Sequence, residues 1–333
     1  MSDDLLKIDN LTVQFRGDAG WITAVDDVSL TLREGETLGI VGESGSGKSV
    51  TALSILRLHT AATTRHPTGR ILYAGKDMLA LTARQLRAVR GREIAMIFQD
   101  PMSSLNPVLT ISDQISETLR LHQGLDAAAS RQRAVELLEL VRIPDAKRRV
   151  DEYPHRLSGG MRQRVMIAIA IACRPRLLIA DEPTTALDVT IQAQILDLLR
   201  ELQSSLGMSV ILISHDMGVI AEFARRVVVM YAGRVVETAP VKDLFRQPVH
   251  PYTEGLLAAI PKLDVDVTRL PTIRGSIPDP AQAIQGCRYG PRCPVVLKQC
   301  LVEAPALLPA GPARFARCPP RVTPRVAPRV GAP

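Results

Sequence analysis

Residues 42–49 read Gly42-Glu43-Ser44-Gly45-Ser46-Gly47-Lys48-Ser49, and this stretch decides the fold of the 333-residue chain. Its spacing is that of G-x-x-x-x-G-K-[ST], the phosphate-binding P-loop. Residues 37–41 before it have the apolar character of a buried strand, and residues 50–58 after it carry apolar side chains at helical spacing. A strand, a glycine-rich turn and a helix start direct backbone N–H groups at one point, where the helix dipole favours phosphate. The stretch therefore predicts a nucleotide site in an α/β fold.

The P-loop supplies the first candidate site residues. The motif places the Lys48 ammonium on the β- and γ-phosphates and the Ser49 hydroxyl on Mg²⁺. The loop backbone would surround the phosphates, and the candidate residues for that contact are Gly42, Ser44, Gly45 and Gly47. Kinases, GTPases, helicases and transport ATPases all use such a loop, so the rest of the chain must decide the class.

A second buried strand is expected at residues 177–181, and it ends in the adjacent acids Asp181 and Glu182. This is the Walker-B arrangement, in which the first acid reaches Mg²⁺. The second acid is placed to polarise an attacking water molecule. Two adjacent carboxylates can also form a solvated turn, but a P-loop upstream favours the catalytic interpretation.

Two further segments suit phosphate chemistry. Ser158, Gly159 and Gly160 precede an apolar helix that runs to Ala172. Serine suits a helix N-cap, and the glycines allow a close approach of the backbone, as at a second phosphate site. A core strand at residues 209–213 leads to His215, and α/β sheets present ligand groups at the carboxyl ends of their strands.

The order of elements predicts a P-loop NTPase core with a helical insertion. Residues 111–142 have helical spacing between two strands, so we expect a helical subdomain at about 100–160 inside an ATPase domain of residues 1–240. From Pro240 onward the composition changes, because 17 of the 24 prolines and four of the five cysteines lie there. Residues 241–333 are therefore expected to form an extension with a basic, disordered tail.

Net charge and hydrophobicity limit where in the cell the protein can be expected. The net charge of +7 allows acidic partners such as nucleic acid or anionic lipid, without choosing between them. The longest uncharged apolar run, residues 165–173, is far shorter than the ~20 residues of a spanning helix. The N-terminal residues lack the basic and apolar regions of a signal peptide. These features predict a cytoplasmic protein.

The order of these motifs resembles that of ABC-type ATPase subunits over residues 5 to about 240. The resemblance implies that ATP and Mg²⁺ are the cofactors, that Gln99 contacts Mg²⁺ and the water, and that His215 contacts the γ-phosphate. It also implies that Phe15 stacks on adenine, although Phe15 and Trp21 are both candidates on pattern alone and either could be a core residue. Residues 158–160 would close over ATP held by a partner's P-loop.

Finer features are similar to the dipeptide/oligopeptide importer subfamily, which also includes nickel importers. They are the run Phe98-Gln99-Asp100-Pro101-Met102-Ser103-Ser104-Leu105-Asn106-Pro107, together with residues 250–257 and 273–278 of the extension. The resemblance implies import of di- or oligopeptides at the cytoplasmic face of the cell membrane, with nickel or another small solute as the alternative. It further implies a second related ATPase, two permease subunits and an extracytoplasmic binding protein, without nucleic acid.

Other classes fit less well. A DNA-repair or chromosome ATPase would insert long coiled-coil arms, and no sustained heptads are present. A translation factor of the ABC type would carry two such domains in one chain, and a regulatory protein with a dead nucleotide site would not need Lys48, Asp181 and Glu182. The chain has one P-loop and one LSGG run, Leu157-Ser158-Gly159-Gly160, and no internal repeat. It is therefore predicted to pair with another chain to complete its sites.

Four cysteines cluster in the extension at Cys287, Cys293, Cys300 and Cys318. A reducing cytoplasm disfavours disulfides, and four unrelated buried cysteines are a further possibility. Zinc and iron–sulfur clusters both use four cysteines, but no tight C-x₂₋₄-C knuckle is present. The resemblance to the peptide-importer ATPases favours a [4Fe–4S] cluster over zinc, as a structural clasp.

Overall fold

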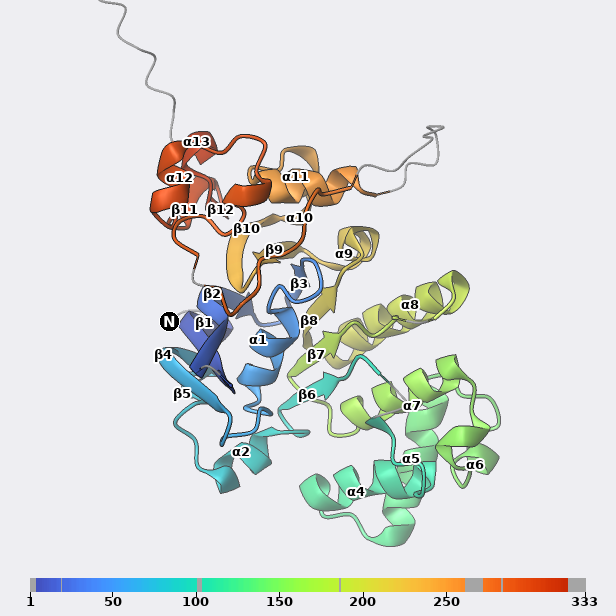
Figure 1. The fold of residues 1–333 in the computed structure, drawn as a ribbon. Coiled ribbons are helices and arrows are strands. Elements are labelled where there is room, and N and C mark those ends of the chain that lie inside the picture. The colour runs from blue at the N-terminus through green and yellow to red at the C-terminus, as the bar shows by residue number, and fades with distance from the viewer. Residues whose placement is uncertain are drawn as a thin grey trace, which may run out of the picture.

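The computed structural model describes residues 4–18, 20–100, 104–185, 187–260, 272–282 and 284–322. Two sheets organise these residues (Figure 1). The smaller is antiparallel with the order β2-β1-β4-β5. Its strands are β1 (Asp4–Gly17), β2 (Gly20–Arg33), β4 (Thr64–Tyr73) and β5 (Lys76–Asp77).

The larger sheet has the order β11-β12-β10-β9-β3-β8-β7-β6, and its strands from β9 to β6 are parallel. Parallel strands are buried on both faces, which explains their continuous apolar sequences. The strands are β3 (Thr37–Val41), β6 (Ile94–Ile97), β7 (Leu177–Asp181), β8 (Ser209–Ser214), β9 (Arg226–Tyr231), β10 (Arg234–Pro240), β11 (Leu308–Gly311) and β12 (Arg314–Ala316).

Alternating side chains of these parallel strands enter two separate cores. Ile179 and Ile211 pack with the small sheet and helix α1, whereas their neighbours Leu178 and Leu212 pack with the helices on the opposite face. The large sheet is thus the middle layer of the molecule. The helices near the small sheet are α1 (Lys48–Ile55) and α2 (Ala83–Val89), and those after β7 are α8 (Val189–Leu206) and α9 (Met217–Phe223).

A block of helices lies between β6 and β7 in the chain and forms the lower right of Figure 1. Its members are α4 (Ile111–Gln123), α5 (Ala127–Leu140), α6 (Ala146–Arg149), a 3-10 turn (Pro154–Arg156) and α7 (Gly159–Ile171). Helix α4 begins in a capping box of Thr110 and Asp113, and it buries Ile115 and Leu119 at the expected helical spacing. The prediction of an α/β fold with a helical insertion is therefore confirmed.

The chain after β10 packs at the top of Figure 1, against the ATPase sheet. Strand β12 pairs with β10 through Glu237 opposite Ala316 and Thr238 opposite Phe315, so the extension adds two strands to that sheet. Whether residues 241–322 act as a separate domain stays a prediction, and the basic tail beyond residue 322 lies outside the described residues. The elements are α10 (Val241–Arg246), α11 (Pro251–Ala258), a 3-10 turn (Gly290–Arg292), α12 (Lys298–Val302) and α13 (Pro319–Val322).

Candidate nucleotide site

The P-loop leaves β3 and enters α1 with a left-handed backbone at its glycines. Gly42, Gly45 and Gly47 have φ values of 152°, 78° and 97°, a region that L side chains rarely adopt. A Cβ at Gly42 would lie 2.2 Å from the Met230 carbonyl oxygen, so no side chain fits there. The sequence-predicted glycines therefore allow a turn that brings backbone amides to the start of α1.

The Lys48 side chain is buried and lies back across the loop. Its Nζ atom donates hydrogen bonds to the carbonyl oxygens of Gly42 at 2.8 Å and Glu43 at 3.0 Å. Burial lowers the pKa of Lys48, while the nearby carboxylates of Glu182, Asp181 and Glu43 act in the opposite direction. The ammonium is thus held at the mouth of the loop, where it can meet a phosphate.

Ser49 and Asp181 meet although 132 residues separate them. The Ser49 hydroxyl donates to Asp181 Oδ1 at 3.1 Å, which brings together two oxygen ligands of the kind that Mg²⁺ prefers. Burial raises the pKa of Asp181, and the hydrogen bond from Ser49 opposes that effect. The two residues fit the expected metal position. Elsewhere in the P-loop, the Ser46 hydroxyl is buried and has no hydrogen-bond partner within the described structure.

The Glu182 carboxylate lies close to two other predicted site residues, Gln99 and His215. Its Oε2 atom accepts a hydrogen bond from Gln99 Nε2 at 2.9 Å and one from the Thr185 hydroxyl at 2.9 Å, and it lies 3.2 Å from His215 Nδ1. The Glu182 backbone has a φ of 47°, an uncommon value for a non-glycine residue and one associated with functional sites. Four neighbouring parallel strands, β3, β8, β7 and β6, thus deliver their carboxyl ends to one site.

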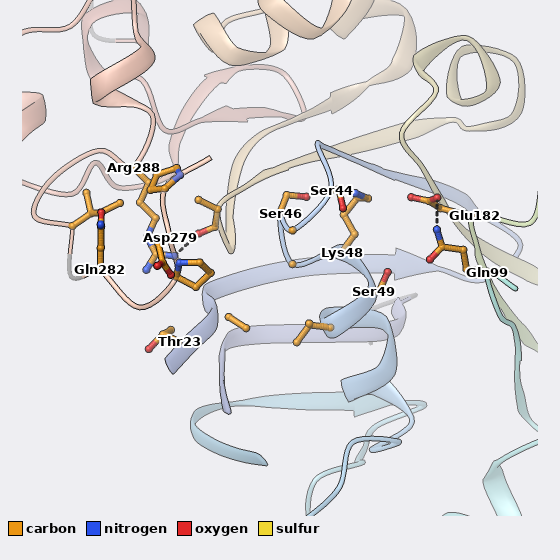
Figure 2. Close-up of a pocket in the computed structure, with 18 residues that line it drawn as sticks. Thr23, Ser44, Ser46, Lys48, Ser49, Gln99, Glu182, Asp279, Gln282 and Arg288 are labelled. Atoms are coloured by element: carbon orange, nitrogen blue, oxygen red, sulfur yellow. Dashed lines mark hydrogen bonds between the residues drawn. The ribbon is translucent and has the colours of Figure 1, made fainter. Parts of the chain in front are cut away.

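A cavity of 320 Å³ lies over the P-loop and reaches Gln99 and Glu182 (Figure 2). Its far wall comes from the C-terminal extension, which sequence reasoning did not place at the site. That wall consists of Pro278, Asp279, Pro280, Gln282, Ile284 and Arg288. Pro278 falls in the run that resembles the importer extension, but nothing in that run signals contact with the P-loop.

Phe15 lies in β1 and does not line this cavity. Its ring packs edge to face on His59, with 5.0 Å between ring centroids, and it is partly buried against the core of the small sheet. Trp21 is 39% exposed and carries the Arg65 guanidinium 4.3 Å from its ring centroid. The stacking of adenine on Phe15 stays a prediction.

Ser158, Gly159 and Gly160 form the start of α7, away from this cavity. Ser158 caps the helix by accepting a hydrogen bond from the Met161 N–H, and both Ser158 and Gly159 are exposed. A Cβ at Gly160 would lie 2.8 Å from a methyl group of Ile191 on α8, so glycine permits this close helix contact. Ser158 and Gly159 are thus accessible to solvent, as a contact with a partner chain requires.

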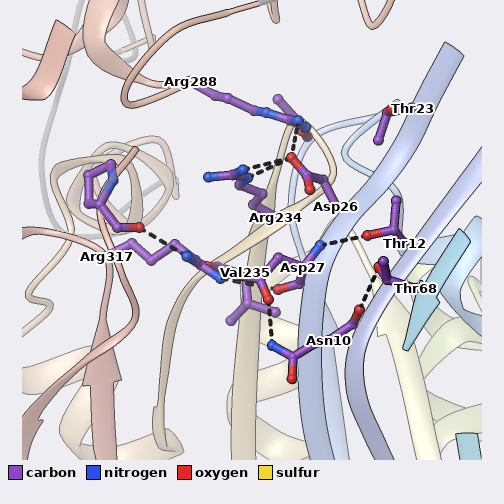
Figure 3. A network of polar contacts seen from close by, with 12 residues as sticks. Asn10, Thr12, Thr23, Asp26, Asp27, Thr68, Arg234, Val235, Arg288 and Arg317 are labelled. Carbon is purple, nitrogen blue, oxygen red and sulfur yellow. Dashed lines mark hydrogen bonds and ion pairs between the residues drawn. The ribbon is translucent and has the colours of Figure 1, made fainter. Parts of the chain in front are cut away.

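A network of hydrogen bonds and ion pairs connects the C-terminal extension to β2 beside the nucleotide site (Figure 3). Asp26 accepts hydrogen bonds from Arg234 and from Arg288 of the cavity wall, and Asp27 accepts from Arg317 at 2.7 Å and from Asn10 at 2.7 Å. Burial would raise the pKa of Asp27, but the hydrogen bonds from Asn10 and Arg317 outweigh it and hold the pKa below its ordinary value. The network joins β2 to the extension.

The predicted metal centre in the extension is wrong. Cys287, Cys293, Cys300 and Cys318 all belong to the described residues. Across all the described residues, no group of three or more cysteine, histidine or carboxylate side chains could hold a metal ion. All four are free cysteines. Burial raises the pKa of Cys287 and Cys293 and brings that of Cys318 to about 11. Neither a [4Fe–4S] cluster nor zinc is supported.

None of the described helices is long and apolar enough to cross a membrane.

Comparisons with known proteins agree with this geometry. Residues 25–185 match the family described as ABC transporter, and residues 236–300 match the oligopeptide/dipeptide transporter C-terminal region. The chain is 61% identical over 318 residues to a putative peptide import ATP-binding protein of Brucella abortus, covering 96% of this chain and 95% of that protein. It is 51% identical over 314 residues to the oligopeptide transport ATP-binding protein AppD of Bacillus subtilis, covering 94% and 96%.

Solved structures of ATP-binding cassettes are also similar to this chain. The ATP-binding cassette MJ0796, as a dimer in a post-hydrolysis state with ADP and phosphate, matches with a TM-score of 0.64 and 30% identity, over 71% of this chain and 98% of that one. The cbiO1 protein of Clostridium perfringens, part of an ABC transporter complex, matches with a TM-score of 0.62 and 28% identity, over 74% and 92%. The chain is an ATPase of the ABC transporter family and carries the C-terminal region of its oligopeptide/dipeptide transporter group.

Proposed function

We propose that the chain is the ATP-hydrolysing subunit of an importer of di- or oligopeptides at the cytoplasmic face of the cell membrane. The observation that carries the proposal is the convergence of the P-loop, Asp181, Glu182, Gln99 and His215 at one sheet edge. The similarity to importer ATP-binding proteins extends through the C-terminal extension, which supports the peptide class of substrate.

Each site residue receives one role in this proposal. The P-loop amides and Lys48 bind the phosphates of ATP, and Ser49, Asp181 and Gln99 hold Mg²⁺, which supplies positive charge to the phosphate oxygens when bound. Glu182 accepts a proton from the attacking water. His215, already 3.2 Å from that carboxylate, orients it and contacts the γ-phosphate. Phe15 is assigned to adenine.

The chain supplies only half of each complete site. Ser158, Gly159 and Gly160 are exposed or half-buried and do not line the cavity over the P-loop of their own chain. We propose that they close over ATP on a second, related ATPase, whose own LSGG segment closes over this P-loop. The dimer of the MJ0796 cassette supports pairing of this kind. Two permease subunits and an external binding protein would complete the transporter.

The assembled complex tests this proposal. We expect the chain to co-purify with two permease subunits from solubilised membranes, and its ATPase activity in vesicles to rise when the binding protein is loaded with peptide. Stimulation by Ni²⁺ but not by any di- or oligopeptide would reject the peptide assignment while leaving the ATPase role intact. Absence of any membrane partner would reject transport.

The segment from Gln99 to about Leu119 is proposed as the docking surface for a permease helix, because it leads from the Glu182 contact into the helical block. Met102 and Ser103 of this segment lie outside the described residues. Val108 follows them and is 75% exposed, so its side chain is accessible to a partner chain.

Val108→Asp is therefore expected to abolish peptide uptake and permease binding while basal ATPase activity stays near wild type, since Val108 does not line the cavity over the P-loop. The matched control is Val302→Asp, an equally exposed valine (75%) on α12 of the extension. Uptake at the wild-type rate in Val108→Asp vesicles would contradict the docking role of this segment.

A further inference from the structure

Glu43, the second residue of the P-loop, is bound by two residues of the C-terminal extension. Its N–H donates to the Tyr252 hydroxyl at 2.8 Å, and its carboxylate accepts two hydrogen bonds from the Arg292 guanidinium, at 2.9 and 3.2 Å. The Glu43 carbonyl oxygen accepts from Lys48 Nζ at 3.0 Å. The phosphate-binding lysine and the extension therefore meet on one residue, across more than 200 positions of sequence.

Tyr252 and Arg292 are themselves held rigidly. Tyr252 is fully buried, and its ring packs edge to face on Tyr231 with 4.7 Å between centroids. The Arg292 side chain is only 5% exposed and also donates to the carbonyl oxygens of Ile273 at 3.2 Å and Arg274 at 2.8 Å. The guanidinium is planar. It is held by backbone carbonyls and also donates two hydrogen bonds to the carboxylate, so it fixes that carboxylate in one orientation.

Charge and protonation suit this arrangement. Burial would lower the pKa of Arg292, but its hydrogen bonds with Glu43 and Tyr231 raise the pKa above the ordinary value. Burial raises the pKa of Tyr252, so its hydroxyl stays protonated and can accept the Glu43 N–H. The contacts are therefore a charged pair and a neutral hydrogen bond, both partly shielded from water.

We propose that Tyr252 and Arg292 are positioning residues for ATP binding, acting through Glu43. A glycine-rich loop pays a conformational cost when it orders around phosphate. The contacts to the backbone and side chain of Glu43 lower this cost, because they hold the loop and the Lys48 ammonium in place before ATP binds. The extension then controls how well the site binds nucleotide. The inference rests on the proposed ATP contacts of the P-loop and Lys48.

The test measures binding of a fluorescent ATP analogue to the full chain, together with the rate of hydrolysis. Arg292→Met and Tyr252→Phe should each weaken binding, by about tenfold for Arg292→Met because it removes hydrogen bonds to a charged group. KM for ATP should rise by a similar factor with kcat nearly unchanged, since neither residue touches the reacting atoms. Arg292→Lys should lie between, because lysine keeps the charge but not the two-pronged contact.

Arg321→Met is the matched control. It removes the same charge from the extension and breaks an ion pair with Glu254, which does not involve the P-loop. ATP affinity should stay within twofold of wild type in this variant. Thermal unfolding without nucleotide is measured for every variant, and Tyr252→Phe and Arg292→Lys carry the test if Arg292→Met does not fold.

A double-mutant cycle separates positioning from general loosening. If Arg292 acts through Glu43, then Glu43→Gln combined with Arg292→Met should lose no more ATP affinity than the worse single variant. The inference would be overturned if the losses of ATP affinity in Glu43→Gln and Arg292→Met were additive, or if Arg292→Met bound ATP as well as the Arg321→Met control. Normal ATP binding by the wild-type chain would in that case still support the ATP site. A wild-type chain that binds no ATP would overturn the site and this inference together.

Discussion

Glu182→Gln is expected to reduce ATP hydrolysis by roughly 10²-fold or more, the usual scale for losing a general base, while ATP still binds. Glutamine has nearly the same shape but cannot accept the proton of the attacking water. The hydrogen bonds that Gln99 and Thr185 donate to Glu182 can be kept by the amide oxygen, so the site should stay folded. The ATP-bound dimer should then accumulate, because its hydrolysis no longer drives opening.

Phosphate release and size-exclusion chromatography with ATP measure the two effects. Glu201→Gln is the control, since Glu201 is an exposed acid paired with Arg142 on the surface. Hydrolysis at near the wild-type rate in Glu182→Gln would remove Glu182 from its assigned role. A monomer in the presence of ATP would argue against the expected pairing.

Lys48→Ala should weaken ATP binding itself, by roughly 10- to 100-fold, because it removes a charged hydrogen-bond donor to phosphate. The variant also leaves the carbonyl oxygens of Gly42 and Glu43 without their present donor, so the thermal stability of the chain must be measured beside affinity. Calorimetric titration with ATP gives the affinity, and Lys7→Ala, at an exposed surface pair with Asp9, is the control. Unchanged affinity would count against the P-loop assignment.

The strands and their terminal residues were predictable because their signals are local. A short apolar run followed by Asp181 and Glu182, or by Lys48 after a glycine turn, depends on residues within one element. Parallel pairing then brings the ends of β3, β8, β7 and β6 together without any further information. The predicted α/β fold and the ATPase class are both confirmed on this basis.

The wall of the cavity was not predictable in the same way. Arg288 reaches Asp26 across 262 positions and Arg292 reaches Glu43 across 249, and no periodicity or motif encodes such contacts. The cysteine prediction failed for a related reason. The four cysteines line one small cavity together. Clustering in the sequence does not determine whether the thiols take the arrangement that a metal needs, and in the part of the chain that the structure describes no group of three or more such side chains could hold a metal ion.

The pairing of β12 with β10 has a consequence for the surface of the molecule. Without the extension, β10 would end the large sheet with unpaired backbone N–H and C=O groups, which can recruit a strand from another chain. The extension replaces this edge with β11, a strand of four residues that contains Pro309 and ends at Gly311. Proline and short length both discourage further pairing. The C-terminal segment thus protects the ATPase sheet from growing into aggregates.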